Sequence, residues 1–167
     1  MRVIRWIDKL SEWTGSAVSW AVVPLTIIVI IEVCSRYIFN KPTEWAYDMS
    51  WMLYAAFFMM GGAYALLYRR HIRIDVLYQF IPPRGKAIFD SILFLLVLLP
   101  PVALFAWQGV RFAVHTWSIG ETIQTTTWGP PAGPIRTMIP IAFILLWFQG
   151  VAELVRSIVR AKKGGEL

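Results

Sequence analysis

The sequence predicts an all-α integral membrane protein with four transmembrane helices, both termini in the cytoplasm, and an amphipathic N-terminal helix on the inner surface. Three observations predict this class. Hydrophobic residues make up 57% of the 167 residues and charged residues only 16%, whereas soluble domains contain about 25% charged residues. The apolar residues form four long runs, and Lys and Arg gather on one side of them. Residues 1–167 therefore form a single membrane domain.

Four segments are long enough to cross the hydrocarbon core, which takes about 20 mostly apolar residues in a helix. Core helices of a soluble bundle would show a polar stripe, but the centres of these segments are apolar all round. In the third segment, Pro100 and Pro101 must kink or loosen the helix. No charged residue lies within a turn of them, so we expect the kink to serve shape rather than substrate binding. The predicted spans cover residues 17–37, 46–68, 87–107 and 137–155.

The distribution of Lys and Arg predicts the orientation, because short loops rich in these residues stay in the cytoplasm. The two terminal flanks and the loop between spans two and three hold twelve of them, and the opposite side holds four. We therefore expect a multi-pass inner-membrane protein with both termini in the cytoplasm. The net charge of +6 sits beside apolar runs, which favours lipid as its partner and argues against nucleic acid.

The stretch before the first span, residues 2–13, carries apolar residues at mostly three- or four-residue spacing, with charged residues between them. This pattern is typical of an amphipathic helix lying on the inner membrane surface. A second arrangement stays open, in which the stretch extends the first helix into the headgroup layer.

Charged pairs gather at the turn between spans one and two. Glu32 and Arg36 are four residues apart, as are Glu44 and Asp48, so each pair is expected to share a helix face. We expect one structural polar cluster here, with Trp45 at the interface. The alternative is that Glu32 couples transport to a proton or cation, because a carboxylate within a span is costly and usually functional.

Small residues form a patch in span two. Gly61 and Ala65 are four residues apart, Gly62 lies beside them, and Ala55 extends the face. Small side chains allow another helix to approach closely. The patch therefore predicts helix packing against either an internal neighbour or another subunit.

The loop from Thr116 to Pro134 is the largest outward-facing feature. It carries Trp117, Glu121 and Trp128, and four prolines fall between positions 130 and 140. Because proline removes a backbone donor and clashes with the preceding turn, we expect an extended chain through most of this loop.

Residues that could carry chemistry are few. The single cysteine, Cys34, excludes a disulfide within the chain, and His71 and His115 are predicted on opposite sides of the membrane. Arg70, His71 and Asp75 could form an interfacial element of the cytoplasmic loop. No nucleotide-binding, zinc or serine-triad motif is present. We expect no catalytic residue, cofactor, metal or bound nucleotide.

The stretch EVCSRYIFNKPTEWAYDMSWMLYAAFFMMGGAYALLYRRHIRIDVL, residues 32–77, resembles the small membrane subunit of TRAP (tripartite ATP-independent periplasmic) transporters, the DctQ-like or Q-type subunit. That family has an Arg and an aromatic residue at the end of span one, a turn with Pro and Trp, an acidic residue opening span two, a Gly-Ala patch and a basic loop. The acidic residue is more often Glu, so Asp48 departs mildly. The matching positions are Arg36, Tyr37, Pro42, Trp45, Asp48, Gly61, Gly62, Ala63, His71 and Asp75.

The resemblance implies a stable heterodimer with a large membrane subunit that carries the substrate and coupling-ion sites. It also implies transient contact with a periplasmic binding protein, with the small subunit as scaffold and Trp117, Glu121 and Trp128 as candidates for the docking loop. Uptake of a small organic acid would be driven by an ion gradient. The alternatives are an autonomous four-helix cation-coupled transporter that uses Glu32, and a subunit of another membrane complex.

Overall fold

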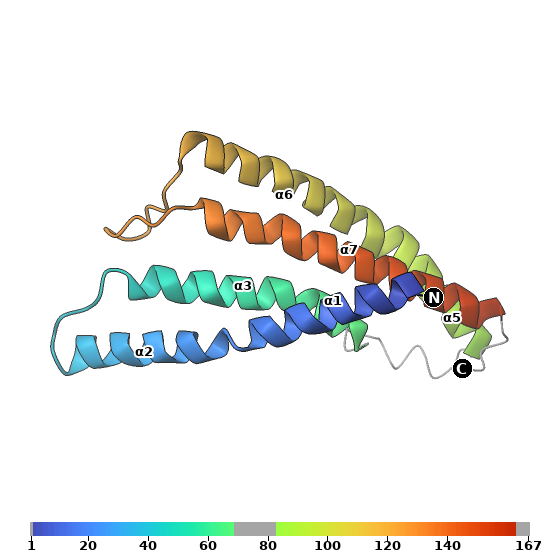
Figure 1. Cartoon of the computed structure of the whole chain (residues 1–167), viewed down its shortest axis with the longest axis horizontal. Helices are drawn as coiled ribbons and strands as arrows, with labels where there is room; N and C mark the ends of the chain where they lie inside the picture. The colour runs from blue at the N-terminus through green and yellow to red at the C-terminus, as the bar shows by residue number, and fades with distance from the viewer. Residues whose placement is uncertain (1, 69–82, 163–167) are drawn as a thin grey trace.

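The computed structural model describes residues 2–68 and 83–162, and this part of the chain is almost entirely helical (Figure 1). Four helical stretches are long and apolar enough to cross a membrane, which confirms the number of spans. Arg70, His71 and Asp75 lie outside the described residues. The elements are α1 (Arg2–Ser19), α2 (Val22–Tyr37), α3 (Ala46–Leu67), α5 (Pro83–Ile92), the π-helical segment η1 (Leu93–Leu98), α6 (Leu99–Ile119) and α7 (Gly133–Lys162).

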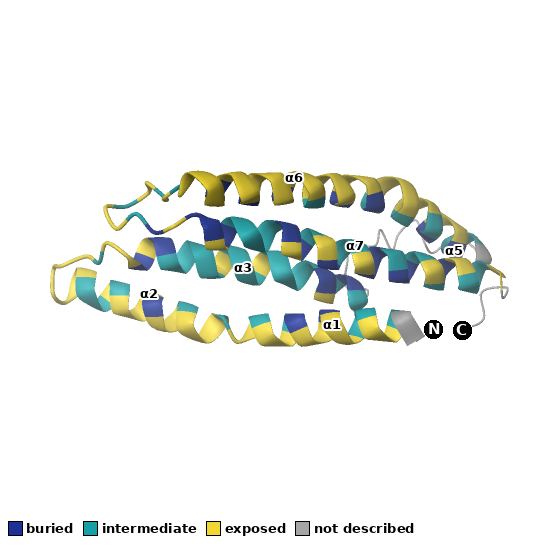
Figure 2. Cartoon of the chain, turned by 45° about the horizontal axis from the view of Figure 1, so that its top comes forward, coloured by how far each residue is buried: buried dark blue, intermediate teal, exposed yellow. Residues whose placement is uncertain are grey.

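The spans stand in an open row. Figures 1 and 2 show α6, α7, α3 and the α1–α2 pair in that order. The central helix is α7, which packs against α6, α3, α5 and α1, whereas α2 packs against α3. Burial follows this order, because α7 contributes ten buried residues and α2 contributes one. Many large apolar side chains along the row are exposed, and Figure 2 shows where the exposed residues lie.

The first span consists of two helices that follow one another in nearly the same direction. They are separated at Trp20 and Ala21. Pro24 explains the break, because its ring clashes with the carbonyl four residues earlier, that of Trp20. Together they form one candidate span, Ile4–Tyr37. Of the two arrangements that the sequence left open for residues 2–13, this geometry favours the extension of the first helix, and α1 packs on α3 and α7.

The turn between α2 and α3 has a clear local cause. The N–H of Lys41 bonds to the carbonyl of Ser35 at 2.9 Å, and Asn40 adopts a left-handed conformation with φ of 50°. Asn tolerates this conformation better than most residues, and Pro42 then prevents the helix from resuming. The second span, α3, begins and ends within one residue of the predicted range.

The helix of the third span is longer than the predicted span. It runs without a break from Gly85 to Ile119, twelve residues beyond the predicted end at Trp107. The helix ends where Gly120 adopts φ of 61° and the Glu121 N–H bonds to the Thr116 carbonyl at 3.2 Å, a common helix terminus. The sequence did not indicate this extension, because the last turns of the helix, around Arg111 and His115, contain charged and polar residues.

Pro100 and Pro101 loosen the third span as predicted. The turn that precedes them is π-helical, and the Leu99 N–H bonds to the Phe94 carbonyl, five residues earlier. The two proline rings clash with the carbonyls of residues 96 and 97 in an ideal α-helix. Widening the turn over residues 93–98 relieves that clash. A single π-helical turn is a recognised irregularity of α-helices.

The fourth span is also longer than predicted, because α7 begins at Gly133 rather than near residue 137. The expectation of an extended chain through most of the loop does not hold for its last part, because the helix already begins at Gly133. Pro134 lies in the first turn, where no N–H is needed. Pro140 lies inside α7 and is buried where α6 crosses it.

The crossing of α6 and α7 depends on Gly109. A Cβ at this position would lie 3.3 Å from the backbone nitrogen and Cδ of Pro140. We expect Gly109→Ala to lower the stability of the protein in detergent by about 1–3 kcal/mol, because the proline backbone cannot easily yield. Gly61→Ala is the matched control, since nothing lies within 4 Å of its Cβ position, and it should gain up to about 1 kcal/mol. Thermal unfolding measures both, and shifts of the same sign would contradict the prediction.

Candidate functional site

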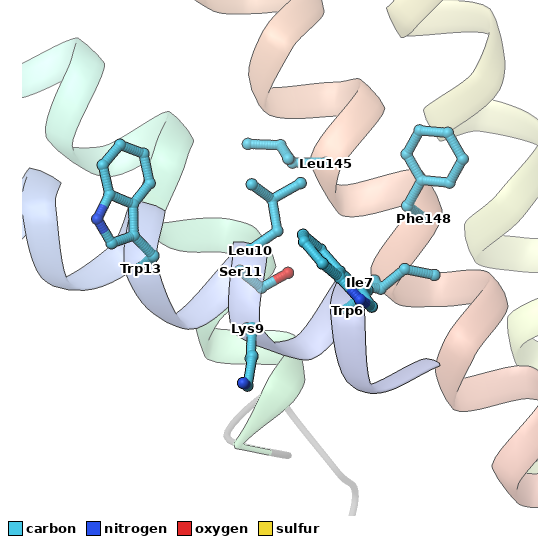
Figure 3. A pocket seen from close by; sticks show the side chains of 8 residues that line it. All are labelled: Trp6, Ile7, Lys9, Leu10, Ser11, Trp13, Leu145 and Phe148. Atoms are coloured by element: carbon cyan, nitrogen blue, oxygen red, sulfur yellow. The ribbon is translucent and has the colours of Figure 1, made fainter. Parts of the chain in front are cut away.

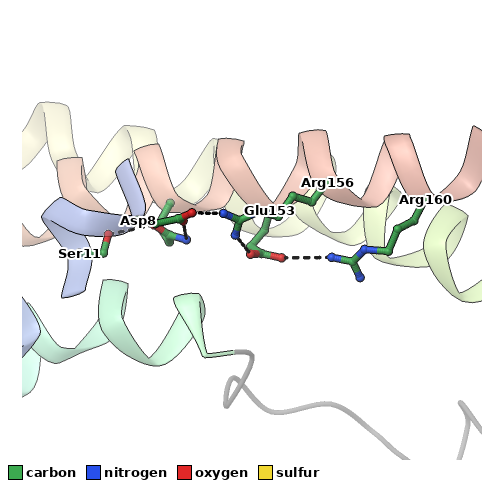
Figure 4. A network of polar contacts seen from close by, with 6 residues as sticks. Asp8, Ser11, Glu153, Arg156 and Arg160 are labelled. Atoms are coloured by element: carbon green, nitrogen blue, oxygen red, sulfur yellow. Dashed lines mark hydrogen bonds and ion pairs between the residues drawn. The ribbon is translucent and has the colours of Figure 1, made fainter. Parts of the chain in front are cut away.

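A network of charged and polar side chains joins α1 to α7 near the end where α1 begins and α7 ends (Figure 4). Arg156 donates to Asp8 of α1 and to Glu153, and Arg160 lies 3.8 Å from Glu153. The side chain of Gln149, which is fully buried, accepts from Ser11 at 2.9 Å and donates to Asp8 at 3.2 Å. The network holds α1 on the central helix.

This network was not predicted from the sequence. Its members on α7 have helical spacing at positions 149, 153, 156 and 160, which was a usable signal for a polar face at the end of span four. Its members on α1, Asp8 and Ser11, lie on the same helix face as Thr14, and both Ser11 and Thr14 are buried. What the sequence could not show is that this polar face of α1 turns toward protein.

An apolar groove lies beside the network, between α1 and α7 (Figure 3). Its volume is about 530 Å³, and Leu10, Leu145 and Phe148 line it together with Trp6 and Trp13. Both tryptophans are more than two-thirds exposed, which is typical of side chains at a membrane interface. Lys9 also lines the groove, and in Figure 3 its side chain points away from α7.

At the opposite end, Glu32 and Arg36 form the predicted pair. Arg36 Nε donates to Glu32 at 3.0 Å, and a second guanidinium nitrogen contacts the same carboxylate oxygen. The other carboxylate oxygen accepts from the backbone N–H of Thr43 at 3.0 Å and from the Thr43 hydroxyl. The carboxylate thereby ties the end of α2 to the turn that follows it.

Asp48 belongs to a separate cluster, so the prediction of one polar cluster at this turn is corrected. Its buried carboxylate accepts from Trp51 Nε1 at 3.2 Å and from the hydroxyl of Thr126. Thr126 belongs to the loop between α6 and α7, which we call the outer loop because the sequence predicts that it faces outward. Glu44 is exposed and joins neither cluster within the described residues, and Trp45 is partly exposed. The physical reason is that α3 begins only at Ala46, so the helical spacing assumed for Glu44 and Asp48 does not apply.

The small residues of α3 divide between two environments. Ala63 is buried, whereas a Cβ at Gly61 or Gly62 would meet nothing within 4 Å. Ala55 lines a cavity at the outer end of the row, and Ala65 is partly exposed. The two glycines are therefore open to a neighbour from outside the described chain.

The outer loop folds back on itself. Ile123 N–H bonds to the Pro130 carbonyl at 2.8 Å, and Ala132 N–H bonds to the Glu121 carbonyl at 2.9 Å. At its base, Arg136 forms a two-point ion pair with Glu121 and donates to Thr116 at 2.7 Å. The guanidinium also lies 4.3 Å from the centre of the Phe112 ring.

The two tryptophans proposed for this loop have different settings. Trp117 lies on α6, where its Nε1 donates to Thr137 at 2.9 Å and its ring covers Gly133. Trp128 lies in the loop and is 46% exposed. Trp117 therefore supports the α6–α7 contact although it is 60% exposed, and Trp128 also lies at the surface.

The Glu121–Arg136 pair predicts a dependence on acid pH. The hydrogen bonds from Arg136 hold the pKa of Glu121 below its ordinary value of 4.5. The pair therefore stabilises the loop above that value, and this contribution is lost as the pH falls through the lower pKa of the folded state. We expect Trp128 fluorescence to report loop opening as the pH falls through that lowered pKa. Glu121→Gln should remove this step, and an unchanged profile in that variant would contradict the prediction.

The described residues contain no group of three His, Cys, Asp or Glu side chains placed to hold a metal ion. Every buried polar side-chain atom of the described residues has a hydrogen-bond partner. The arrangement can fix helices and loops relative to one another. Among the described residues, the charged side chains that line the two cavities are Lys9 in the groove beside α1 and the paired Glu121 and Arg136 in the other cavity.

Comparison with known proteins assigns the chain to a family. The family model described as tripartite ATP-independent periplasmic transporters, DctQ component, matches residues 25–160. The chain belongs to the DctQ family. It is thus a transporter component of the small permease type, as the resemblance implied. The matched range of the DctQ model begins within α2, so it includes the α7 side of the inner network and leaves out α1.

Two relatives carry related names. The sialic acid TRAP transporter permease protein SiaT of Haemophilus influenzae is 25% identical over 146 residues, which cover 87% of this chain and 22% of SiaT. The C4-dicarboxylate TRAP transporter small permease protein DctQ of Vibrio cholerae is 23% identical over 88 residues, which cover 50% of this chain and 38% of that protein. The matched regions are thus well under half the length of these relatives.

Proposed function

We propose that this DctQ-family chain is a scaffold for a larger membrane subunit during ion-gradient-driven uptake of a small organic acid. The main support for the proposal is that the acidic groups of its helices are already bound within the chain. Glu32, Asp48 and Glu153 each bind side chains of their own chain. Substrate and ion sites in membranes need polar groups that face a pathway, so these sites are expected in a partner.

The length of SiaT supports the existence of that partner. The match to this chain covers 22% of SiaT, so most of that permease protein has no counterpart here. We infer that its remaining part corresponds to a separate large subunit that binds this chain. The exposed large apolar side chains along the helix row and the open glycines of α3 are suited to such a contact.

We place the protein in the bacterial inner membrane with both termini in the cytoplasm. The excess of Lys and Arg in the terminal flanks and the loop between spans two and three supports this orientation. The start of α1 and the end of α7 lie at the same end of the row, as an even number of spans requires.

The family match supports the subunit over both alternatives from the sequence. A carboxylate that couples transport must exchange protons or ions, and Glu32 is already bound by Arg36 and Thr43. No observation favours a subunit of another membrane complex.

Purification in mild detergent tests the proposal. The full chain, expressed with the genes beside it, should retain a membrane protein several times its own size, identified by mass spectrometry. Transport by proteoliposomes should require both chains and an ion gradient, and should not require ATP. Transport by this chain alone would contradict the scaffold role and favour the autonomous transporter.

We further propose that the outer loop receives the periplasmic binding protein. Trp128→Ala should lower transport that depends on the binding protein without changing the thermal stability, because its ring is exposed. Trp117→Ala is the informative contrast and should lower stability, because it loses the bond to Thr137. Unchanged transport in Trp128→Ala would count against docking at this loop.

A further inference from the structure

A cavity of about 590 Å³ opens at the outer end of the helix row. It lies over α7, between α3 and α6, which both pack against α7. Its size is within the range of about 300–1,000 Å³ that small-molecule sites occupy. The outer loop covers its upper part through Thr122, Gln124 and Thr125.

The cavity is layered from polar to apolar. Its floor is formed by Ala55, Met59, Phe112 and Ile139, all within candidate membrane spans. From Trp51 to Met59 this wall extends eight residues along α3, or about 12 Å. That length is less than half of the hydrocarbon core of about 30 Å, so a lipid chain lying along this wall fits within one leaflet.

The mouth of the cavity has charged groups without net charge. Glu121 and Arg136 both line it, and their two-point ion pair neutralises both. The neighbouring Thr and Gln side chains offer neutral donors and acceptors. A ligand that suits this arrangement has an apolar tail and a polar head without net charge. The groove beside α1 differs, because it lacks such a polar mouth.

We propose that this cavity binds one phospholipid of the outer leaflet with a zwitterionic headgroup, such as phosphatidylethanolamine. One acyl chain lies on the floor between α3 and α6, and the headgroup lies under the outer loop against Thr122 and Gln124. The lipid would fill a gap that the open row leaves between two spans. This site goes beyond the scaffold role and does not depend on it.

Tryptophan quenching in the purified full chain tests the proposal. Phosphatidylethanolamine brominated in its acyl chains is added to detergent micelles at increasing mole fraction. The Trp51 signal is the difference between wild type and Trp51→Phe, and the Trp107 signal is obtained likewise. Trp107 is 61% exposed and lies outside the cavity lining, so it reports bulk lipid. Trp51 should reach half-quenching at a several-fold lower mole fraction than Trp107, and brominated phosphatidylglycerol should show a smaller difference.

Filling the floor gives the second arm. Ala55→Phe should move the Trp51 curve onto that of Trp107, with helical content checked by circular dichroism. Ala103→Phe is the matched control, because Ala103 is exposed on α6. It lies nine residues before Phe112, or two and a half helical turns, so the two residues are on opposite faces of the helix. Coincident Trp51 and Trp107 curves in the wild type would overturn the proposal, as would an unchanged curve in Ala55→Phe. Equal quenching by the two headgroups would overturn the zwitterionic assignment.

Discussion

Replacing Gly61 with Leu is expected to release the large membrane subunit while the chain itself stays folded. The Cβ position of Gly61 is open for 4 Å within the described chain, so the added side chain meets no internal neighbour at its base. Leu also favours a helix by roughly 1 kcal/mol relative to Gly. A partner helix packed closely on small residues would be pushed away by the larger side chain. The measurement is the amount of partner that co-purifies in mild detergent.

The control for this experiment is Ala103→Leu, which adds apolar volume at an exposed position of α6. It should leave co-purification unchanged. Thermal unfolding of the isolated chain should be unchanged or slightly improved in Gly61→Leu. Full retention of the partner by Gly61→Leu would exclude this face of α3 from the subunit interface.

Replacing Arg156 with Ala is expected to detach α1 from the central helix. The change removes the cation that joins Asp8 to Glu153, and Glu153, which is only 3% exposed, keeps the more distant Arg160 at 3.8 Å. Removing one partner of a buried ion pair costs about 3–5 kcal/mol. We expect about 3 kcal/mol here, the lower end, because the Arg156 side chain is 26% exposed. Thermal unfolding in detergent measures the loss, and the fluorescence of Trp6 and Trp13 follows α1.

Arg36→Ala is the matched control for this variant. It also breaks an ion pair within a span, but the Arg36 side chain is 56% exposed. Its unfolding midpoint should fall much less, because solvent-exposed pairs contribute little. Arg156→Lys should retain part of the lost stability, since it keeps the charge without the two-point geometry. Equal shifts in Arg156→Ala and Arg36→Ala would show that the inner network does not fix α1.

The spans themselves were predictable because membrane insertion depends on local composition. About 20 consecutive apolar residues are sufficient for a crossing helix whatever its neighbours are. The Glu32–Arg36 pair was predictable for a similar reason, as four-residue spacing within a helix brings side chains together. Where the spacing crossed a helix boundary, as for Glu44 and Asp48, the same reasoning failed. The helix ends at Ile119 and Gly133 were missed because polar and proline-rich outer turns are helical here.

The long-range contacts could not be predicted from a single sequence. Asp8 and Arg156 are 148 residues apart, and Asp48 and Thr126 are 78 residues apart. No local pattern relates such positions. The open order of the helices also decided which small residues are buried, so that Ala63 faces the row while Gly61 and Gly62 remain open.

The sequence by itself determined that this chain has four spans and that their centres lack usable polar groups, because both properties depend only on which residues are consecutive. The tertiary structure alone decided that the spans form an open row around α7. It also decided that the polar face of α1 is used internally and that a layered cavity remains between α3 and α6. The physical reason is that lipid tails are as apolar as the side chains of a neighbouring helix. Hydrophobicity therefore does not select which helices become neighbours. Close packing at glycines and a few buried polar contacts select them instead.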